Sequence, residues 1–260
     1  MTYIDEFYES HNEDERLTSQ SGSVEYITTL KYINEYAKKV SAKSILEIGA
    51  GTGRYSIALA NEGFNVTAVE LTEHNISVLK QKSTGNENLT TIQGNALDLS
   101  FLPDNSFDIT LSLGPMYHLY TKENKIKALN EAIRVTKPNG YILVAYCMNE
   151  PTIVQFVFLE NHLNECLEKN MLKADWHCKS EEKDVFELVR TEDIEQLNKE
   201  LSAKRVKIVA TDGMTNYFKQ NINDMDKETF NKWLDFHLKT CERQDIIGAS
   251  NHTLDILRKE

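Results

Sequence analysis

Between Ser44 and Tyr146 the chain alternates short apolar runs with segments whose apolar residues recur at helical spacing. The runs are rich in β-branched residues and apolar at consecutive positions, as strands covered on both faces are. This alternation predicts a doubly wound, mostly parallel α/β sheet. We expect strands at residues 44–48, 65–69, 89–93, 107–113 and 140–146, and helices at 52–61, 74–82 and 122–135.

Two segments fall outside this alternation. Residues 1–43 begin acidic and then show helical spacing, which predicts an N-terminal helical cap. Residues 152–204 carry a wide apolar stripe, which predicts a helical insert after the fifth strand; this insert is either a lid over the site or a cap on the core. Residues 205–260 supply the last strands and a helix, so we expect a single domain built on a core at 44–146.

Charge and cysteine usage exclude several classes of protein. The 29 Lys and Arg residues against 40 Asp and Glu residues give a net charge of −11, which disfavours a nucleic-acid partner because phosphates require a basic face. No apolar run approaches the roughly 20 residues of a membrane-spanning helix, and the N-terminus lacks a secretory signal. Four cysteines without a CxxC pair predict free thiols, a cytoplasmic protein and no metal site.

The stretch from Ile45 to Arg54 carries the strongest functional signal, because a strand, a glycine-rich turn and a helix start follow one another. Such a unit opens nucleotide-binding α/β folds, and its glycines let the backbone approach a ligand. The dinucleotide pattern G-x-G-x-x-G needs glycine where Arg54 stands, which disfavours an NAD-dependent oxidoreductase. Glu47, just before the loop, suits an amino-bearing ligand better than a pyrophosphate. A tight turn without a ligand is the alternative.

Glu70 adds a second signal. It ends the second expected strand, 17 residues beyond Gly53. An acidic residue at about this distance from a glycine-rich loop can accept hydrogen bonds from ribose hydroxyls. The alternative is an ordinary exposed glutamate at a strand end.

Three later stretches, 94–99, 107–118 and 137–143, complete an ordered set of motifs. With them, residues 44–146 resemble the class I S-adenosylmethionine-dependent methyltransferases. The resemblance implies a Rossmann-like, seven-stranded sheet whose last strand is antiparallel. It also implies S-adenosylmethionine as cofactor and S-adenosylhomocysteine as product.

The resemblance further implies how the cofactor lies. Glu47 and the glycine loop would follow its methionine end, Glu70 would bind the ribose, and Asn95 would meet the adenine edge. Many family members carry Asp where Asn95 stands, but an Asn oxygen can still accept a hydrogen bond. A softer N-terminal resemblance adds an aromatic and a basic residue that would close over the cofactor carboxylate. The implied cofactor-binding residues are Tyr8, Arg16, Glu47, Gly49, Ala50, Gly51, Gly53, Glu70, Leu71, Asn95, Ala96 and Leu113.

His118 and Tyr117, after the fourth strand, are the candidate catalytic residues. They lie where open α/β folds bind ligands, and an imidazole can act as a general base. The alternative is that they only start a helix and pack. We expect a small-molecule methyl acceptor; a protein or RNA methyltransferase and a non-catalytic cofactor-binding module are the alternatives. The sequence Leu113-Gly114-Pro115-Met116 lacks the Asn/Asp-Pro-Pro-aromatic motif of enzymes that methylate exocyclic base amines.

The position of the two outlying segments predicts a cover over the site. The insert leaves the fifth strand at its carboxyl end, where ligands bind in open α/β folds. We expect residues 1–22 and 152–204 to form this cover together, with Phe156 or Phe158 facing the pocket and water excluded from it.

Overall fold

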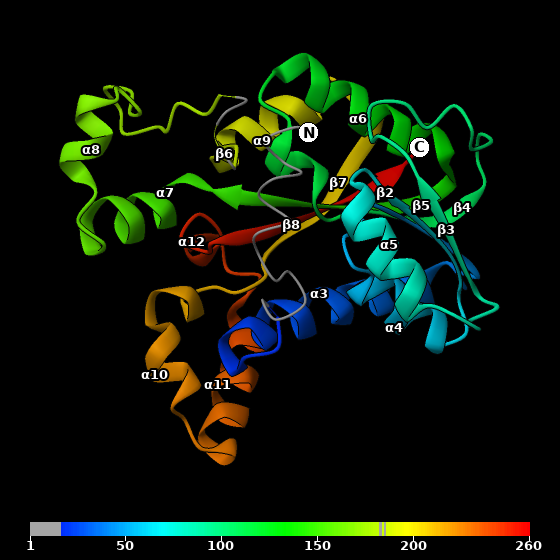
Figure 1. Ribbon diagram of the computed structural model, residues 1–260, viewed down its shortest axis with the longest axis horizontal. Helices are drawn as coiled ribbons and strands as arrows, with labels where there is room; N and C mark the ends of the chain where they lie inside the picture. Colours follow the sequence, from blue (N-terminus) through cyan, green and yellow to red (C-terminus); the bar gives the residue numbers. More distant parts are fainter. Residues whose placement is uncertain (1–16, 182–183, 185) are drawn as a thin grey trace.

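The computed structural model describes residues 17–181, 184 and 186–260, and its centre is a twisted sheet (Figure 1). Seven strands follow the order β3-β2-β1-β4-β5-β8-β7, and a two-residue strand, β6, pairs with β5. Strands β1 to β5 pair in parallel, whereas β8 runs antiparallel to both β5 and β7. The strands are β1 Ser44–Ile48, β2 Asn65–Glu70, β3 Leu89–Gln93, β4 Phe107–Ser112, β5 Thr136–Met148, β6 Leu188–Val189, β7 Ala203–Ala210 and β8 His252–Lys259. The mostly parallel Rossmann-like sheet with an antiparallel last strand is therefore confirmed.

Helices cover both faces of the sheet. In Figure 1, α6 and α9 lie on one side, and α3, α4 and α11 lie on the other. The helices are α3 Gln20–Lys39, α4 Arg54–Asn61, α5 Glu73–Lys82, α6 Lys122–Val135, α7 Asn149–Thr152, α8 Leu163–Glu168, α9 Thr191–Asn198, α10 Lys219–Asn223, α11 Lys227–Thr240 and α12 Gln244–Ile247. Tighter or wider turns are η1 Pro115–His118, η2 Ile153–Leu159 and η3 Thr215–Phe218.

Strand β5 shows why the sheet needs two helical layers. Its residues 142–148 are all buried, and successive side chains join opposite cores. Ile142 and Val144 pack in the core with α6 and α9, whereas Leu143 and Ala145 pack in the core with α3 and α4. Because strand side chains alternate between faces, a strand that is apolar at every position must be covered on both sides.

The helices that follow β2 and β4 begin at threonines. The Thr72 hydroxyl accepts a hydrogen bond from Asn75 N at the start of α5, and the Thr121 hydroxyl accepts one from Asn124 N at the start of α6. Such caps satisfy backbone N–H groups that a helix leaves unpaired. They also fix where the loops between strand and helix end.

The insert at 152–204 differs from the expected long helix. It contains the π-helical turn η2, the short helix α8, an isolated bridge between Leu172 and Cys178, and then β6 and α9. Asn161 and Asn170 adopt positive φ values after η2 and α8, where the helical segments end, and Trp176 adopts one in the turn between Leu172 and Cys178. The apolar stripe therefore packs in pieces, and part of it forms a small separate core around Ile153, Val157 and Cys166.

All four cysteines are free thiols. Among the described residues, no helix is both long and apolar enough to cross a bilayer.

Candidate active site

A cavity of about 690 Å³ lies where β1, β2 and β4 end. Its wall brings together segments that are far apart in the sequence: the glycine loop, the end of β2, the residues after β3 and the η1 turn. The lining residues with expected roles are Glu47, Gly49, Ala50, Gly51, Glu70, Leu71, Asn95, Ala96, Leu113, Tyr117 and His118. The carboxyl ends of parallel strands meet at one edge, which explains why these segments converge.

The glycine loop has the backbone that its composition predicts. Gly49 and Gly51 have φ values of +71° and +55°, which glycine adopts without strain. A Cβ at Gly49 would lie 2.7 Å from Pro115 Cδ, whereas a Cβ at Gly51 would meet no atom within 4 Å. Gly49 is therefore required by packing against η1, and Gly51 leaves open space in the cavity wall.

Glu70 holds this loop in place. Its side chain is buried, and Oε2 accepts a hydrogen bond of 2.8 Å from Gly51 N. Oε1 accepts from Thr72 N at 2.9 Å and from the Thr72 hydroxyl at 3.0 Å. Asn75 Nδ2 also donates to Oε1, at 3.5 Å. These donors fix the orientation of the buried carboxylate, and Oε2 can still accept a further hydroxyl.

Glu47 is also buried, but its hydrogen-bond donors come from a different residue. The hydroxyl of Ser56 in α4 donates to Glu47 Oε2. Burial raises the pKa of Glu47 to about 8, although the hydrogen bonds from Ser56 oppose the shift. Glu47 is therefore largely protonated at neutral pH until a cationic group lies beside it.

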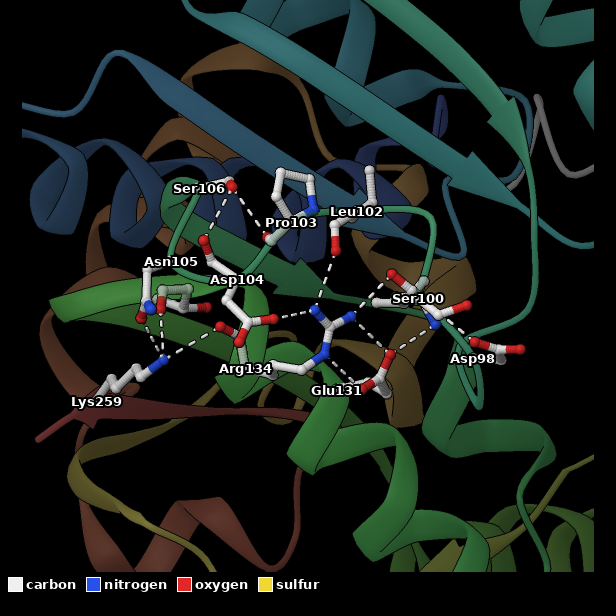
Figure 2. A network of polar contacts seen from close by, with 12 residues as sticks. Asp98, Ser100, Leu102, Pro103, Asp104, Asn105, Ser106, Glu131, Arg134 and Lys259 are labelled. Carbon is white, nitrogen blue, oxygen red and sulfur yellow. Dashed lines mark hydrogen bonds and ion pairs between the residues drawn. The ribbon is translucent and has the colours of Figure 1, made fainter.

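Asn95 and the loop after it form the far end of the cavity. Asn95 Oδ1 accepts a 2.9 Å hydrogen bond from Leu97 N, which leaves the amide N–H₂ as its free donor. Figure 2 shows the polar network that fixes the following loop, in which Arg134 donates to Leu99 O at 2.8 Å and to Leu102 O at 3.0 Å. Glu131 accepts both from Arg134 and from Leu99 N, so α6 anchors the loop that carries Asn95.

Tyr117 and His118 belong to an aromatic group at the η1 turn. Their ring centroids lie 6.4 Å apart, and Phe186 contacts Tyr117 at 6.4 Å and His118 at 5.8 Å. Tyr117 is buried, and both residues line the cavity. Phe186 lies in the insert just before β6, and Glu187 N next to it donates to Tyr117 O at 2.6 Å, so this part of the insert contacts the site.

The sequence around this cavity is similar to a known family. Residues 46–144 match the family described as a methyltransferase domain. That match spans the loop, Glu70, Asn95 and His118. This part of the chain therefore resembles a methyltransferase domain, as its sequence motifs predict.

Relatives are similar to part of the sequence, and solved structures share the fold. A demethylmenaquinone methyltransferase of Clavibacter sepedonicus is 34% identical over 113 residues, 43% of this chain and 44% of that protein. The chain thus matches less than half the length of this curated relative. The PH0226 protein of Pyrococcus horikoshii shares the fold with a TM-score of 0.62, 17% identity and coverage of 98% and 99% of the two chains. A SAM-dependent methyltransferase of Archaeoglobus fulgidus follows with a TM-score of 0.57, 17% identity and coverage of 91% and 94%.

Three further residues, Tyr8, Arg16 and Gly53, are expected to bind the cofactor. Tyr8 and Arg16 lie outside the described residues. Gly53, with φ of +89°, does not line the cavity. A Cβ there would collide with Leu79 Cδ1 of α5, so this glycine is required where α4 packs against α5. Its role in binding the cofactor stays a prediction.

The cover expected over the cavity differs in detail. Phe156 stacks on His162 with ring centroids 4.1 Å apart, and Phe158 contacts Trp176 at 5.5 Å. Neither phenylalanine lines the cavity, because the insert folds partly on itself. Of the segment before α3, the structure describes residues 17–19, and Leu17 lines the cavity.

Several residues that line the cavity are not predicted from the sequence. Arg54 serves in the sequence only to exclude the dinucleotide pattern, yet it lies on the cavity wall. Its position directly after the glycine loop could have predicted this. The other missed lining residues are Leu17, Thr52, Tyr55, Thr72, Asn75, Gly94, Leu97, Gly114, Pro115, Leu119, Tyr120, Thr121 and Asn124.

A buried charged group behind Tyr117 was also missed, because its members are far apart in sequence. Glu25, Asp212 and His252 place one potential ligand atom each within 4.8 Å of one another. Asp212 accepts hydrogen bonds from the Ser250 hydroxyl and from His252. Burial lowers the pKa of His252, but the neighbouring carboxylates outweigh it and raise the pKa above its usual range. We interpret this group as an ion-pair network that supports Tyr117, whose ring lies 5.9 Å from that of His252.

Proposed function

We propose that this protein transfers a methyl group from S-adenosylmethionine to a small planar acceptor. The single observation that carries the proposal is the shared cavity. It joins a glycine loop held by Glu70 to the rings of Tyr117 and His118, against which Phe186 packs. One end offers polar groups for a nucleoside, and the other offers ring faces on which a flat molecule can stack.

The residues present fit the cofactor. Open space at Gly51 admits the ligand close to the backbone, and Glu70 offers acceptors to ribose hydroxyls. Asn95 offers an N–H₂ donor toward the adenine edge. Glu47 is a buried acid that would ionise beside the cofactor's cationic amino group. When bound, the cofactor supplies a methyl group already activated by its sulfonium.

The chain's own contribution to the reaction is alignment and water exclusion. Holding the acceptor in line with the methyl group is worth about 7–11 kcal/mol in favourable cases. We propose that His118 accepts the proton that an O–H, N–H or C–H acceptor loses as the new bond forms. Tyr117 would orient the acceptor, because its buried ring is fixed between His118, Phe186 and His252.

The relatives favour a small acceptor over a macromolecule. The Clavibacter sepedonicus relative is named for demethylmenaquinone, a small molecule, which agrees with the aromatic end of this cavity. The net charge of −11 disfavours RNA as the acceptor.

Calorimetry and a methyl-transfer assay test the proposal. We expect the full chain to bind S-adenosylhomocysteine and not NAD. It should also transfer label from S-adenosylmethionine to a member of a panel of quinols, phenols and aromatic amines. Replacing His118 with alanine should lower kcat and leave cofactor affinity unchanged. Binding of NAD in place of the homocysteine nucleoside would overturn the proposal, whereas cofactor binding without transfer to any acceptor class would support a non-catalytic module.

A further inference from the structure

Lys125 lies on the buried face of α6, where a charged side chain is unexpected. Its side chain is 8% exposed. Among the described residues of α6, the other buried ones are all apolar: Ala128, Leu129, Ala132, Ile133 and Val135. Lysine is almost never buried to this extent without a partner. The position therefore requires an anion inside the fold.

That anion is the carboxylate of Glu187, which lies in the insert just before β6. Lys125 Nζ is 2.5 Å from Glu187 Oε1, and the Glu187 side chain is 14% exposed. A buried ion pair adds little net stability over an apolar pair of similar volume, because both charges lose their hydration. It differs from an apolar pair in being directional, so it forms in one alignment of the two segments. The pair therefore fixes how the insert lies on α6.

The residues beside this ion pair contact the candidate catalytic residues. Glu187 N donates a 2.6 Å hydrogen bond to Tyr117 O. The Phe186 ring packs against the rings of Tyr117 and His118, with centroid distances of 6.4 and 5.8 Å. On the other side of Glu187, β6 pairs with the end of β5. A shift of Glu187 would therefore move either the η1 turn or the ring that packs on it.

A further contact attaches the insert next to η1. Tyr120 lines the cavity, and its hydroxyl donates a 2.6 Å hydrogen bond to Asp184 O. This bond and the bond from Glu187 N both end on backbone carbonyls, which every residue carries. The ion pair, in contrast, needs a carboxylate side chain at one position. It is therefore the contact that specifies which residues of the insert face η1.

We propose that Lys125 and Glu187 are positioning residues for methyl transfer. Their ion pair holds residues 186–187 against η1, so that Tyr117 and His118 keep the orientation that the acceptor needs. In the described part of the chain neither member of the pair lines the cavity, so the effect passes through the Tyr117 carbonyl and the Phe186 ring. The proposal rests on the proposed function, because it concerns the alignment step of the same reaction.

The test replaces the ion pair with an apolar pair. The double variant Lys125→Met, Glu187→Leu should unfold in urea at a concentration close to that of the wild type, because such replacements are often neutral or stabilising. Its kcat should fall by about 10- to 100-fold, the scale of a small misplacement at a reacting centre. The assay uses the acceptor that the wild type methylates fastest among the quinols, phenols and aromatic amines. Affinity for S-adenosylhomocysteine should stay within about twofold, since the pair does not touch the cofactor end.

Three further variants make the result specific. The reversed pair Lys125→Glu, Glu187→Lys restores an ion pair and should recover part of the lost kcat, which loss of packing alone would not do. Glu187→Gln keeps the size of the side chain and should lower kcat by a smaller factor, and it decides the question if the apolar double variant does not fold. Lys137→Met is the matched control, because Lys137 pairs with Asp108 where β5 begins, at the edge of the sheet opposite the cavity. It should keep the wild-type kcat.

Other outcomes separate this inference from the function beneath it. Wild-type kcat in the folded apolar double variant would overturn the positioning role. An equal loss of kcat and of S-adenosylhomocysteine affinity would overturn it as well, because the whole site would then be disturbed. In both cases the proposed function stands. Absence of methyl transfer by the wild type to every acceptor of the panel would overturn the proposed function, and the positioning role with it.

Discussion

Glu47 near the end of β1 and Glu70 at the end of β2 carry the same side chain to the same cavity. Their surroundings differ. Three donors from Gly51 and Thr72 hold Glu70 at 2.8–3.0 Å, whereas the bond from Ser56 does not offset the burial of Glu47. The donors of Gly51 and Thr72 therefore make Glu70 a fixed acceptor, whereas burial raises the pKa of Glu47 despite the hydrogen bonds from Ser56.

The largest test concerns the loop that Glu70 holds. Gly51→Val should reduce S-adenosylhomocysteine affinity by more than about 100-fold, because the side chain would enter the cavity and a β-branched residue at φ of +55° is strained by about 1–3 kcal/mol. Isothermal titration of the folded variant measures this effect.

Gly85→Val is the matched control. Gly85 has φ of +81° and also has no atom within 4 Å of a built Cβ, but it does not line the cavity. The Gly85→Val variant should carry similar backbone strain and bind S-adenosylhomocysteine with wild-type affinity. Equal affinities in the two variants would show that the loop does not approach the ligand.

The next test removes the fixed acceptor. Glu70→Ala should weaken cofactor binding by roughly 1.5–3 kcal/mol, the range for hydrogen bonds to a charged group. Glu70→Gln keeps one oxygen but turns an N–H₂ group toward either Gly51 N or Thr72 N, since both carboxylate oxygens accept hydrogen bonds. It should therefore cost nearly as much as alanine, as measured by titration with S-adenosylhomocysteine.

Glu73→Gln, at the exposed start of α5, is the control for this pair. Wild-type affinity in both Glu70 variants would mean that Glu70 only ends a strand and that the ribose binds elsewhere.

Local features of the molecule could be predicted from the sequence, whereas features that depend on distant residues could not. The strand at 44–48, the strand at 89–93 and the helix at 122–135 were predicted with their observed bounds, because hydrophobic period and helix caps are local signals. The segments that line the cavity could also be predicted, because parallel strands bring their carboxyl ends together at one edge of the sheet.

The features that the sequence did not predict depend on tertiary contacts. β5 begins at Thr136 rather than at Gly140, and a register shift between Phe107 and Ile109 of β4 accommodates the added residues. The apolar residues of the insert do recur at helical spacing, but positive φ values at Asn161 and Asn170 interrupt the expected helix. The donors around Glu47 could not be read from spacing, and neither could the carbonyl of Leu17 that faces Arg54.

A third test uses the stability of the protein. The pKa of Glu47 is raised from 4.5 to about 8 in the native state, so between these values the native state binds more protons than the unfolded state. The contribution of Glu47 to stability therefore falls as pH rises, by at most about 1.4 kcal/mol per pH unit. Glu47→Gln should become progressively more stable than the wild type from pH 5 to pH 8, measured by urea unfolding.

Glu87→Gln, on an exposed turn, provides the control for stability and should track the wild type at every pH. A stability difference between wild type and Glu47→Gln that does not change with pH would contradict the protonation of Glu47.

The smallest expected effect is on cofactor binding by the Glu47→Gln variant at low pH, and it tests the difference between Glu47 and Glu70 directly. At pH 6 the cofactor-free site holds Glu47 mainly in its neutral form, and glutamine is a neutral residue of the same shape. Glu47→Gln should then bind S-adenosylhomocysteine within about threefold of the wild type, because at this pH the cost of deprotonating Glu47 below its pKa offsets its attraction for the amino group. As pH rises toward 8.5, wild-type Glu47 ionises and attracts the amino group of the ligand, whereas the variant gains nothing, so the gap between them should widen. Titrations at pH 6, 7 and 8.5 measure this gap. A large loss already present at pH 6 would mean that ligand binding drives the ionisation of Glu47 at every pH. A proton should then be released on binding, which titration in buffers of different ionisation enthalpy would detect.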